Sequence, residues 1–165
     1  MRIMAIDCGD ARTGVAVSDE SLTLTGDAWV VCGKSKAETA RSIAYEAIRR
    51  GVFCIIVGHP KNMDGTVGAS AEKSEHFAEL LSSLIAETAQ AELKAQGSHM
   101  AHSKQLVLET DLIKVKLWDE RMTTMGANRV LSEVGKFGKK RKKTIDAVAA
   151  SLILESYLAY LRRDI

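Results

Sequence analysis

Five consecutive apolar residues, Phe53 to Val57, lie between Gly51 and Gly58 and constrain the fold of this chain more than any other segment. A strand with one covered face alternates apolar and polar residues, whereas a continuous apolar run of this length is typical of a strand buried on both faces. Such burial is characteristic of parallel strands in α/β proteins. The run therefore predicts a central, parallel strand in a sheet that is covered by helices.

The residues before this run predict a β-hairpin, a third strand and a helix. Arg2 to Ile6 is apolar, Thr13 to Ser18 alternates, and the segment between them has turn composition. A third strand is expected near Ala28 to Cys32. Ser35 and Glu38 form a capping box, after which small and apolar residues recur at helical spacing until the glycine that precedes the apolar run.

The residues after the run predict further helices and one more strand. A polar, glycine-rich loop from Gly58 to Gly68 is followed by a helix with one apolar face. Lys114 to Trp118 predicts another parallel strand, and helices are expected from about Thr124 to Val134 and from Thr144 to Leu161. The chain is therefore expected to form an α/β fold with a mixed five-stranded sheet, three antiparallel strands and then two parallel, flanked by helices.

A length of 165 residues with 46% hydrophobic residues predicts a single domain over residues 1–165. The segment from about 86 to 111 is expected to be an insertion. Its Gly97 to Met100 coincide with the remnant of an expression tag, but the internal position makes that origin unusual and a chance match equally possible. No stretch approaches the roughly 18 apolar residues of a membrane span, and the first residues do not resemble a signal peptide. Three cysteines without paired spacing argue against a disulfide framework or structural zinc. We expect a cytoplasmic protein that does not bind membranes.

Four acidic residues lie at the ends of separate expected elements. Asp7 follows the first strand, Asp119 and Glu120 follow the last parallel strand, and Asp146 lies in the first turn of the expected final helix. Ligands collect beyond the carboxyl ends of parallel strands, so these acids are candidates for one Mg²⁺ site. Two ions about 4 Å apart can bind both the attacking and the leaving oxygens of a phosphodiester. Each acid also has a structural interpretation, as a turn residue, a solvated strand end or a favourable charge near a helix N-terminus.

The net charge of +2 is unevenly distributed along the chain. From Lys136 to Ile165 there are eight Lys or Arg against three Asp or Glu, so this segment carries +5 and the first 135 residues carry −3. Lys139, Lys140, Arg141, Lys142 and Lys143 form an uninterrupted cationic run. Such a run binds polyanions by releasing their counterions, although a solvated turn ahead of a helix would have the same composition.

Four motifs, in this order along nearly the whole chain, resemble the YqgF family of small RNase H-like proteins, which are similar to Holliday junction resolvases and are regarded as pre-16S rRNA nucleases. The motifs are Ile6-Asp7-x-Gly9 with Arg12-x-Gly14-Val15-Ala16-Val17-Ser18-Asp19; Ile56-Val57-Gly58-x-Pro60-x-Asn62-Met63-Asp64-Gly65; Trp118-Asp119-Glu120-Arg121-x-Thr123-Thr124; and Lys140-Arg141-Lys142-Lys143-x-x-Asp146-x-x-Ala149-Ala150-x-x-Ile153-Leu154. Each motif alone is weak, and the four together are specific.

The resemblance implies an RNase H-like fold and a metal-dependent endonuclease. Asp7, Glu120 and Asp146 would be the catalytic, metal-binding residues, Asp119 would be a further candidate ligand, and Mg²⁺ or Mn²⁺ would be the cofactor. The expected substrate-binding residues are Arg12, Asn62, Asp64, Arg121 and the run Lys139, Lys140, Arg141, Lys142 and Lys143. One departure from the family is Cys8, which stands where proline is usual.

The expected substrate is structured nucleic acid, because only 5% of the residues are aromatic and few are placed to stack on bases. The resemblance favours processing of the 5′ end of precursor 16S rRNA, with the small ribosomal subunit precursor as a partner and a monomer or weak dimer as the active form. Two alternatives remain open: a resolvase of branched DNA, and a non-catalytic RNA-binding factor in ribosome assembly. An ATPase of the actin and sugar-kinase type is disfavoured, since it would need two domains.

Overall fold

The computed structural model describes residues 1–62, 64–95, 113–122 and 139–163. The helix expected from Thr124 to Val134, residues 96–111 of the expected insertion and Gly97 to Met100 lie outside these residues. Within the described ranges, no helix combines the length and the apolar character that crossing a membrane requires.

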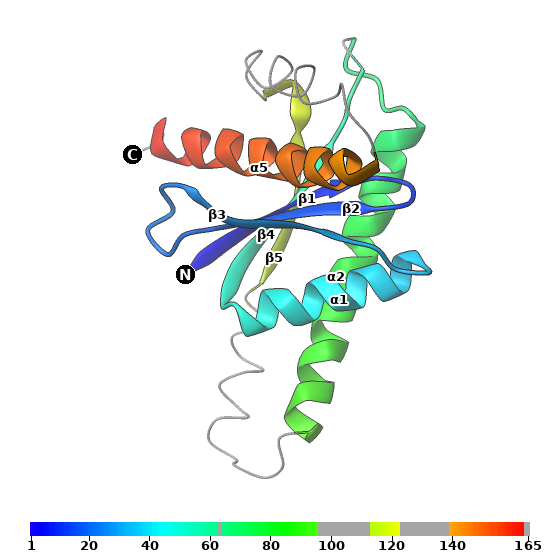
Figure 1. The fold of residues 1–165 in the computed structure, drawn as a ribbon, viewed down its shortest axis with the longest axis vertical. Coiled ribbons are helices and arrows are strands. Elements are labelled where there is room, and N and C mark those ends of the chain that lie inside the picture. Colours follow the sequence, from blue (N-terminus) through cyan, green and yellow to red (C-terminus); the bar gives the residue numbers. More distant parts are fainter. Residues whose placement is uncertain (63, 96–112, 123–138, 164–165) are drawn as a thin grey trace.

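Five strands form one mixed sheet in the order β3-β2-β1-β4-β5 (Figure 1). The central strand β1 (Arg2–Cys8) pairs antiparallel with β2 (Thr13–Ser18), which pairs antiparallel with β3 (Thr25–Val31). On its other side β1 pairs in parallel with β4 (Val52–His59), and β4 pairs in parallel with β5 (Lys114–Asp119). The predicted α/β fold with three antiparallel and then two parallel strands is confirmed.

Helices cover both faces of this sheet (Figure 1). On one face lie α1 (Lys36–Arg49) and α2 (Ala69–Ala95), and on the other lies α5 (Lys139–Arg163). A single 3₁₀ turn, η1 (Glu120–Met122), follows β5 directly. The sheet therefore has two separate cores, one beneath each layer of helices.

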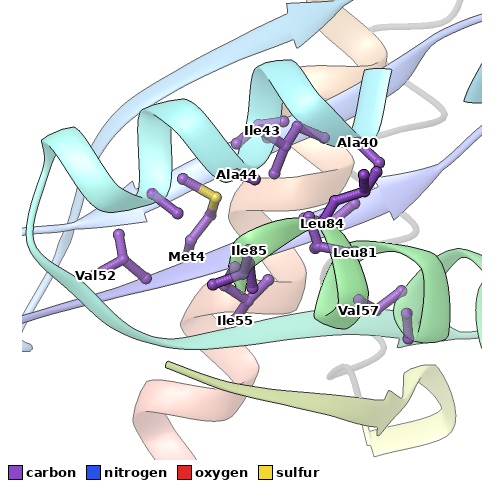
Figure 2. Packing of buried hydrophobic residues seen from close by; sticks show 14 of the residues in the cluster. Met4, Ala40, Ile43, Ala44, Val52, Ile55, Val57, Leu81, Leu84 and Ile85 are labelled. Atoms are coloured by element: carbon purple, nitrogen blue, oxygen red, sulfur yellow. The ribbon is translucent and has the colours of Figure 1, made fainter. Parts of the chain in front are cut away.

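The two cores follow the alternation of side chains along the strands. In β4, Ile55 and Val57 pack against α1 and α2, while Cys54 and Ile56 pack beneath α5. All four side chains are almost completely buried, as the continuous apolar run predicted. Figure 2 shows the first of these cores, where side chains of α1 and α2 meet those of β1 and β4. Each fully buried Ile or Leu contributes about 1.5–3 kcal/mol to stability.

Helix α1 begins where the capping residues predicted. Ser35 accepts a hydrogen bond on Oγ from the backbone N–H of Glu38 at 3.1 Å, and the Glu38 carboxylate accepts one from the N–H of Lys34 at 2.8 Å. The helix ends at Arg49, and Gly51 takes a φ of +64°, which favours glycine at this position.

Several predicted boundaries differ from those in the structure. Strand β4 continues through Gly58 and His59, so the loop begins later than predicted. Helix α5 begins at Lys139 rather than at Thr144, because Lys and Arg are good helix formers and neither glycine nor proline interrupts them. Asp146 therefore lies beyond the first turn of α5, and the helix dipole does not account for it. Helix α2 also continues to Ala95, into the start of the expected insertion.

Helix α5 packs unusually closely against β2 at Gly14. A Cβ atom at Gly14 would overlap the carbonyl oxygen of Asp146 and would lie 2.6 Å from its carbonyl carbon. These are backbone atoms, so a side chain at Gly14 cannot be accommodated by rotating a neighbouring side chain. The absence of a side chain at Gly14 thus allows α5 to bring Asp146 down onto the sheet.

Gly14→Ala is expected to lower the free energy of unfolding by about 1–3 kcal/mol, because α5 must move away from β2 to admit the methyl group. Urea denaturation measures this change. Gly68→Ala is the matched control, since its Cβ would make an ordinary 3.6 Å contact with Nδ2 of Asn62 and should change stability by less than about 0.5 kcal/mol. Equal stability of the two variants would contradict the close packing of α5.

Candidate functional site

The candidate site lies at the carboxyl end of β1, on the face that α5 covers. Ile3 and Ala5 of β1 pack beneath α5, so Asp7 projects from the same face by the alternation of the strand. Asp7 pairs in register with Gly14 of β2, the residue on which the backbone of Asp146 rests. Residues 7 and 146, distant in the sequence, are thereby brought to one place.

Glu120 reaches the same region from the end of β5. A Cβ atom at Gly58 of β4 would overlap Oε1 of Glu120 and would lie 2.6 Å from Cδ1 of Ile153 of α5. Val57, the residue before Gly58, pairs with Ile6 of β1, so the Glu120 carboxylate lies over β4 close to the end of β1. Glycine inside a strand leaves room for this side chain.

The pKa values of two of these carboxyl groups reflect their burial and their closeness. Burial and, to a smaller extent, the charge of Asp146 together raise the pKa of Asp7 to about 6. Burial raises the pKa of Glu120 to about 7, with contributions from the charges of Asp7 and then Asp119. Asp7 thus interacts electrostatically with both Asp146 and Glu120. Concentrated, partly buried negative charge of this kind favours the binding of a cation or a proton.

Arg12, predicted to bind substrate, forms an ion pair with one of the acidic residues, Asp146. Its Nε donates a hydrogen bond to Oδ2 of Asp146 at 2.7 Å, and the two side chains are only 31% and 25% exposed. Arg12 belongs to the turn between β1 and β2, so this ion pair also connects that turn to α5. In this arrangement Arg12 compensates the charge of Asp146.

Asp119 and Glu120 are adjacent in sequence but have different partners. The Asp119 carboxylate accepts hydrogen bonds from the backbone N–H, Nε and Nη2 of Arg121, and these bonds lower the pKa of Asp119. Glu120, in contrast, interacts with Asp7. The structure thus pairs Asp119 and Arg121, two predicted site residues, with each other.

Asn62 and Asp64, also predicted to bind substrate, stabilise their own turn. Asn62 donates from Nδ2 to Oγ1 of Thr66 at 2.8 Å, and Asp64 accepts on Oδ1 from both the N–H and the Oγ1 of Thr66. The hydrogen bonds from Thr66 lower the pKa of Asp64, with a smaller contribution from Arg121. A Cβ atom at Gly65 would lie 3.5 Å from Nη1 of Arg121, so this turn adjoins η1.

The donor set suits a hard divalent cation in its chemistry, since it consists of carboxylates. Among the residues that the structure describes, no three Asp, Glu, His or Cys side chains are arranged closely enough to hold one ion together. Arg12 occupies Asp146 in this arrangement, so a shared ion would require its guanidinium to move. The predicted basic run, Lys139 to Lys143, forms the start of α5, but its side chains lie outside the described part of the chain.

Sequence reasoning did not identify two features of the site region. Gly14 lies in close contact with Asp146, and Gly58 with Glu120, so neither position has room for a side chain. The sequence signal that could have identified Gly58 is its place at the end of a continuous apolar strand, where glycine is otherwise unfavourable. The buried ring of His59 lies with Nε2 2.8 Å from Oε1 of Glu75, which connects the end of β4 to α2.

Burial raises the pKa of the Cys8 thiol to about 12, so this thiol is protonated and is a poor nucleophile.

The raised pKa values predict that stability falls as the pH rises. The reference pKa values are 3.8 for Asp7 and 4.5 for Glu120, so the folded chain binds more protons than the unfolded chain above these values. The free energy of unfolding should therefore fall until the pH passes the folded-state values of about 6 and about 7. Asp7→Asn removes one of these ionisations and should raise the free energy of unfolding by about 1–2 kcal/mol at pH near 8.

Thermal unfolding in the presence of a chelator, from about pH 5 to about pH 8, measures this effect. The control is Asp27→Asn, because Asp27 is exposed and its pKa is lowered by the hydrogen bond from Arg50. Asp27→Asn should not stabilise the protein at high pH. If Asp7→Asn left the pH dependence of stability unchanged, the pKa of Asp7 would not be raised in the folded protein.

Known proteins match this chain over nearly its whole length. A protein of Halothermothrix orenii named "Putative pre-16S rRNA nuclease" is 41% identical over 161 residues, covering 97% of this chain and 96% of the relative. A protein of Acetivibrio thermocellus with the same name is 38% identical over 160 residues, covering 96% and 95%.

The fold also matches a solved structure, T. thermophilus RuvC in complex with a Holliday junction substrate. The TM-score is 0.52 at 14% identity, and the match covers 97% of this chain and 96% of that chain. This likeness confirms the predicted RNase H-like architecture. The sequence profile of the family described as RuvX, Holliday junction resolvase, matches residues 1–94 and 87–160. With the family profile and the relatives in agreement, the chain belongs to the RuvX family of Holliday junction resolvase-like proteins.

Proposed function

We propose that this chain is a metal-dependent endonuclease that processes precursor 16S rRNA. The observation that carries the proposal is the position of Asp7, which interacts electrostatically with both Asp146 and Glu120 at the carboxyl end of the central strand. Relatives that cover almost the whole chain carry a pre-16S rRNA nuclease name, which supports the choice of substrate. Nucleic acid is the class of substrate that fits both the family and the carboxylate site.

Asp7, Glu120 and Asp146 would hold Mg²⁺ or Mn²⁺ in this proposal. When bound, such an ion supplies charge neutralisation for the phosphodiester and activation of the attacking water. The three carboxylates would position the ion and neutralise its charge, and Asp7 and Glu120 would give up their bound protons before they act as ligands. Asp119 is the less favoured ligand, because Arg121 already engages its carboxylate.

Basic and polar residues around the carboxylates would position the substrate. Arg12, released from Asp146, would be free to contact a phosphate next to the cleaved bond. Lys139 to Lys143 would bind flanking phosphates without regard to sequence. Asn62 and Asp64, with Arg121 beside them, would shape the far side of the site through the turn they stabilise. We propose that the protein acts in the cytoplasm on the precursor of the small ribosomal subunit, as a monomer or weak dimer.

Cleavage of branched DNA is the second candidate function. It is favoured by the name of the matching family, and it would use the same carboxylates. A junction resolvase makes two symmetric cuts, so this function would require a two-fold dimer. Parallel assays on a precursor rRNA fragment and a four-way DNA junction, with the oligomeric state measured in solution, separate the two substrates.

Asp146→Asn is expected to reduce Mg²⁺-dependent cleavage of a precursor 16S rRNA fragment by at least about 100-fold, because a neutral amide is a weak ligand for a hard cation. Single-turnover cleavage on denaturing gels measures the rate. Asp27→Asn is the matched control, since Asp27 is an exposed aspartate in β3 that pairs with Arg50 far from the site.

Equal cleavage by Asp146→Asn and the parent protein would exclude the proposed role of Asp146. Tight RNA binding with no cleavage at any Mg²⁺ or Mn²⁺ concentration would instead favour the non-catalytic assembly factor.

Metal binding should release protons, because Asp7 and Glu120 are protonated at a pH near or below about 6 and about 7. Mn²⁺ affinity measured by calorimetry is therefore expected to rise by about tenfold or more between about pH 6 and about pH 8. Repeating the titration in buffers with different ionisation enthalpies gives the number of protons released. Asp7→Asn should flatten this dependence, and a pH-independent Mn²⁺ affinity in the parent protein would contradict the assignment.

A further inference from the structure

Two cavities adjoin the turn between β1 and β2, next to α1, and neither is formed by the carboxylates of the proposed active site. The first has a volume of about 190 Å³. Its lining residues are Cys8, Lys36, Lys73, His76, Phe77 and Leu80. The second has a volume of about 210 Å³, and its cationic lining residues are Arg12, Lys34 and Lys36. Lys36 lines both cavities and so lies at their border.

The first cavity combines an apolar floor with a cationic rim. Phe77 belongs to the core beneath α1 and α2, and Cys8 and Leu80 pack against that core. The Nζ atom of Lys36 lies 6.0 Å from the centre of the Phe77 ring. An apolar cavity of about 150 Å³ is large enough to hold benzene, so the first cavity has room for a single flat ring. Its cationic rim favours a ligand in which that ring is attached to a negatively charged group.

The second cavity suits an anion. The N-terminal N–H groups of α1 do not provide its charge, because Ser35 already accepts the hydrogen bond from Glu38 there. The charge comes mainly from Lys34 and Lys36, because Arg12 is paired with Asp146 and the Asp10 carboxylate, which also lines this cavity, is paired with Lys73. Cationic side chains around a polar cavity are typical binding groups for a phosphate.

The lysines at the first cavity are held in place but remain accessible. Lys73 Nζ lies 2.6 Å from Oδ1 of Asp10, and the two side chains are 55% and 80% exposed. Lys36 donates a hydrogen bond from Nζ to the carbonyl oxygen of Gly9. Exposed pairs of this kind contribute little to stability, so the pair of Lys73 and Asp10 can open to admit a ligand to the first cavity.

We propose that the two cavities together bind one nucleotide of the substrate, its base extruded into the first and its phosphate held at the second. This proposal rests on the proposed nuclease function. Cys8 is the neighbour of Asp7 and projects from the opposite face of β1. A nucleic-acid strand that contacts the carboxylates on one face of the sheet would therefore pass over the β1–β2 turn to reach the cavities on the other face. Extrusion costs least for a nucleotide that is unpaired or at a branch.

Photo-crosslinking tests the proposal without any cleavage step. A precursor rRNA fragment that carries thiouridine at successive unpaired positions is irradiated with the full chain in the presence of a chelator, and crosslinked peptides are identified by mass spectrometry. One position is expected to crosslink to the peptide that contains Phe77, which holds none of the proposed metal ligands. Leu80→Trp places a larger side chain in the volume that the base would occupy and should reduce this crosslink by about fivefold or more.

Two further variants complete the experiment. Lys73→Ala should weaken the same crosslink, while Arg41→Ala removes one exposed cation of α1 outside both cavities and should leave it unchanged. Thermal unfolding verifies that each variant is folded. If RNA crosslinks only elsewhere, or if Leu80→Trp crosslinks like the parent protein, the nucleotide site is wrong even when the parent protein cleaves RNA. Failure of the parent protein to bind or cleave RNA would instead overturn the proposed function.

Discussion

The contact between the backbone of α5 and Gly14 of β2 is the constraint on which the rest of the site depends. It sets how close the helix lies to the sheet, and this distance places Asp146 beside Asp7. Gly58 has the corresponding role on the other side of β1, where the missing side chain leaves room for Glu120. Two glycines within strands thus determine the spacing of three carboxylates from three separate elements.

The carboxylates are stable in this position only because their charge is compensated. Asp146 is paired with Arg12, while Asp7 and Glu120 retain protons to a higher pH than exposed carboxyl groups do. A divalent ion would replace both kinds of compensation at once. The arrangement therefore has a cost in folding stability that metal binding would recover, which is common at sites built for binding rather than for stability.

Local patterns in the sequence were sufficient for most of the fold. The buried run of β4, the hairpin and the cap at Ser35 are each determined by neighbouring residues, and each was predicted correctly. The start of α5 was not, because Thr144 has the composition of a cap but lies inside a run of good helix formers. The pairing of Arg12 with Asp146 joins residues 134 positions apart, and the different partners of Asp119 and Glu120 depend on the path of the chain after β5. These contacts are tertiary, so no local pattern contained them.

The order of the site residues along the chain has a consequence for synthesis. Asp7 lies in β1, the first strand among the described residues, whereas Asp146 lies in α5, the last helix among them. A nascent chain still held by the translating ribosome cannot complete the carboxylate set until α5 has emerged and docked on β2. On the proposed function, a chain from which α5 is missing would therefore lack a complete nuclease site.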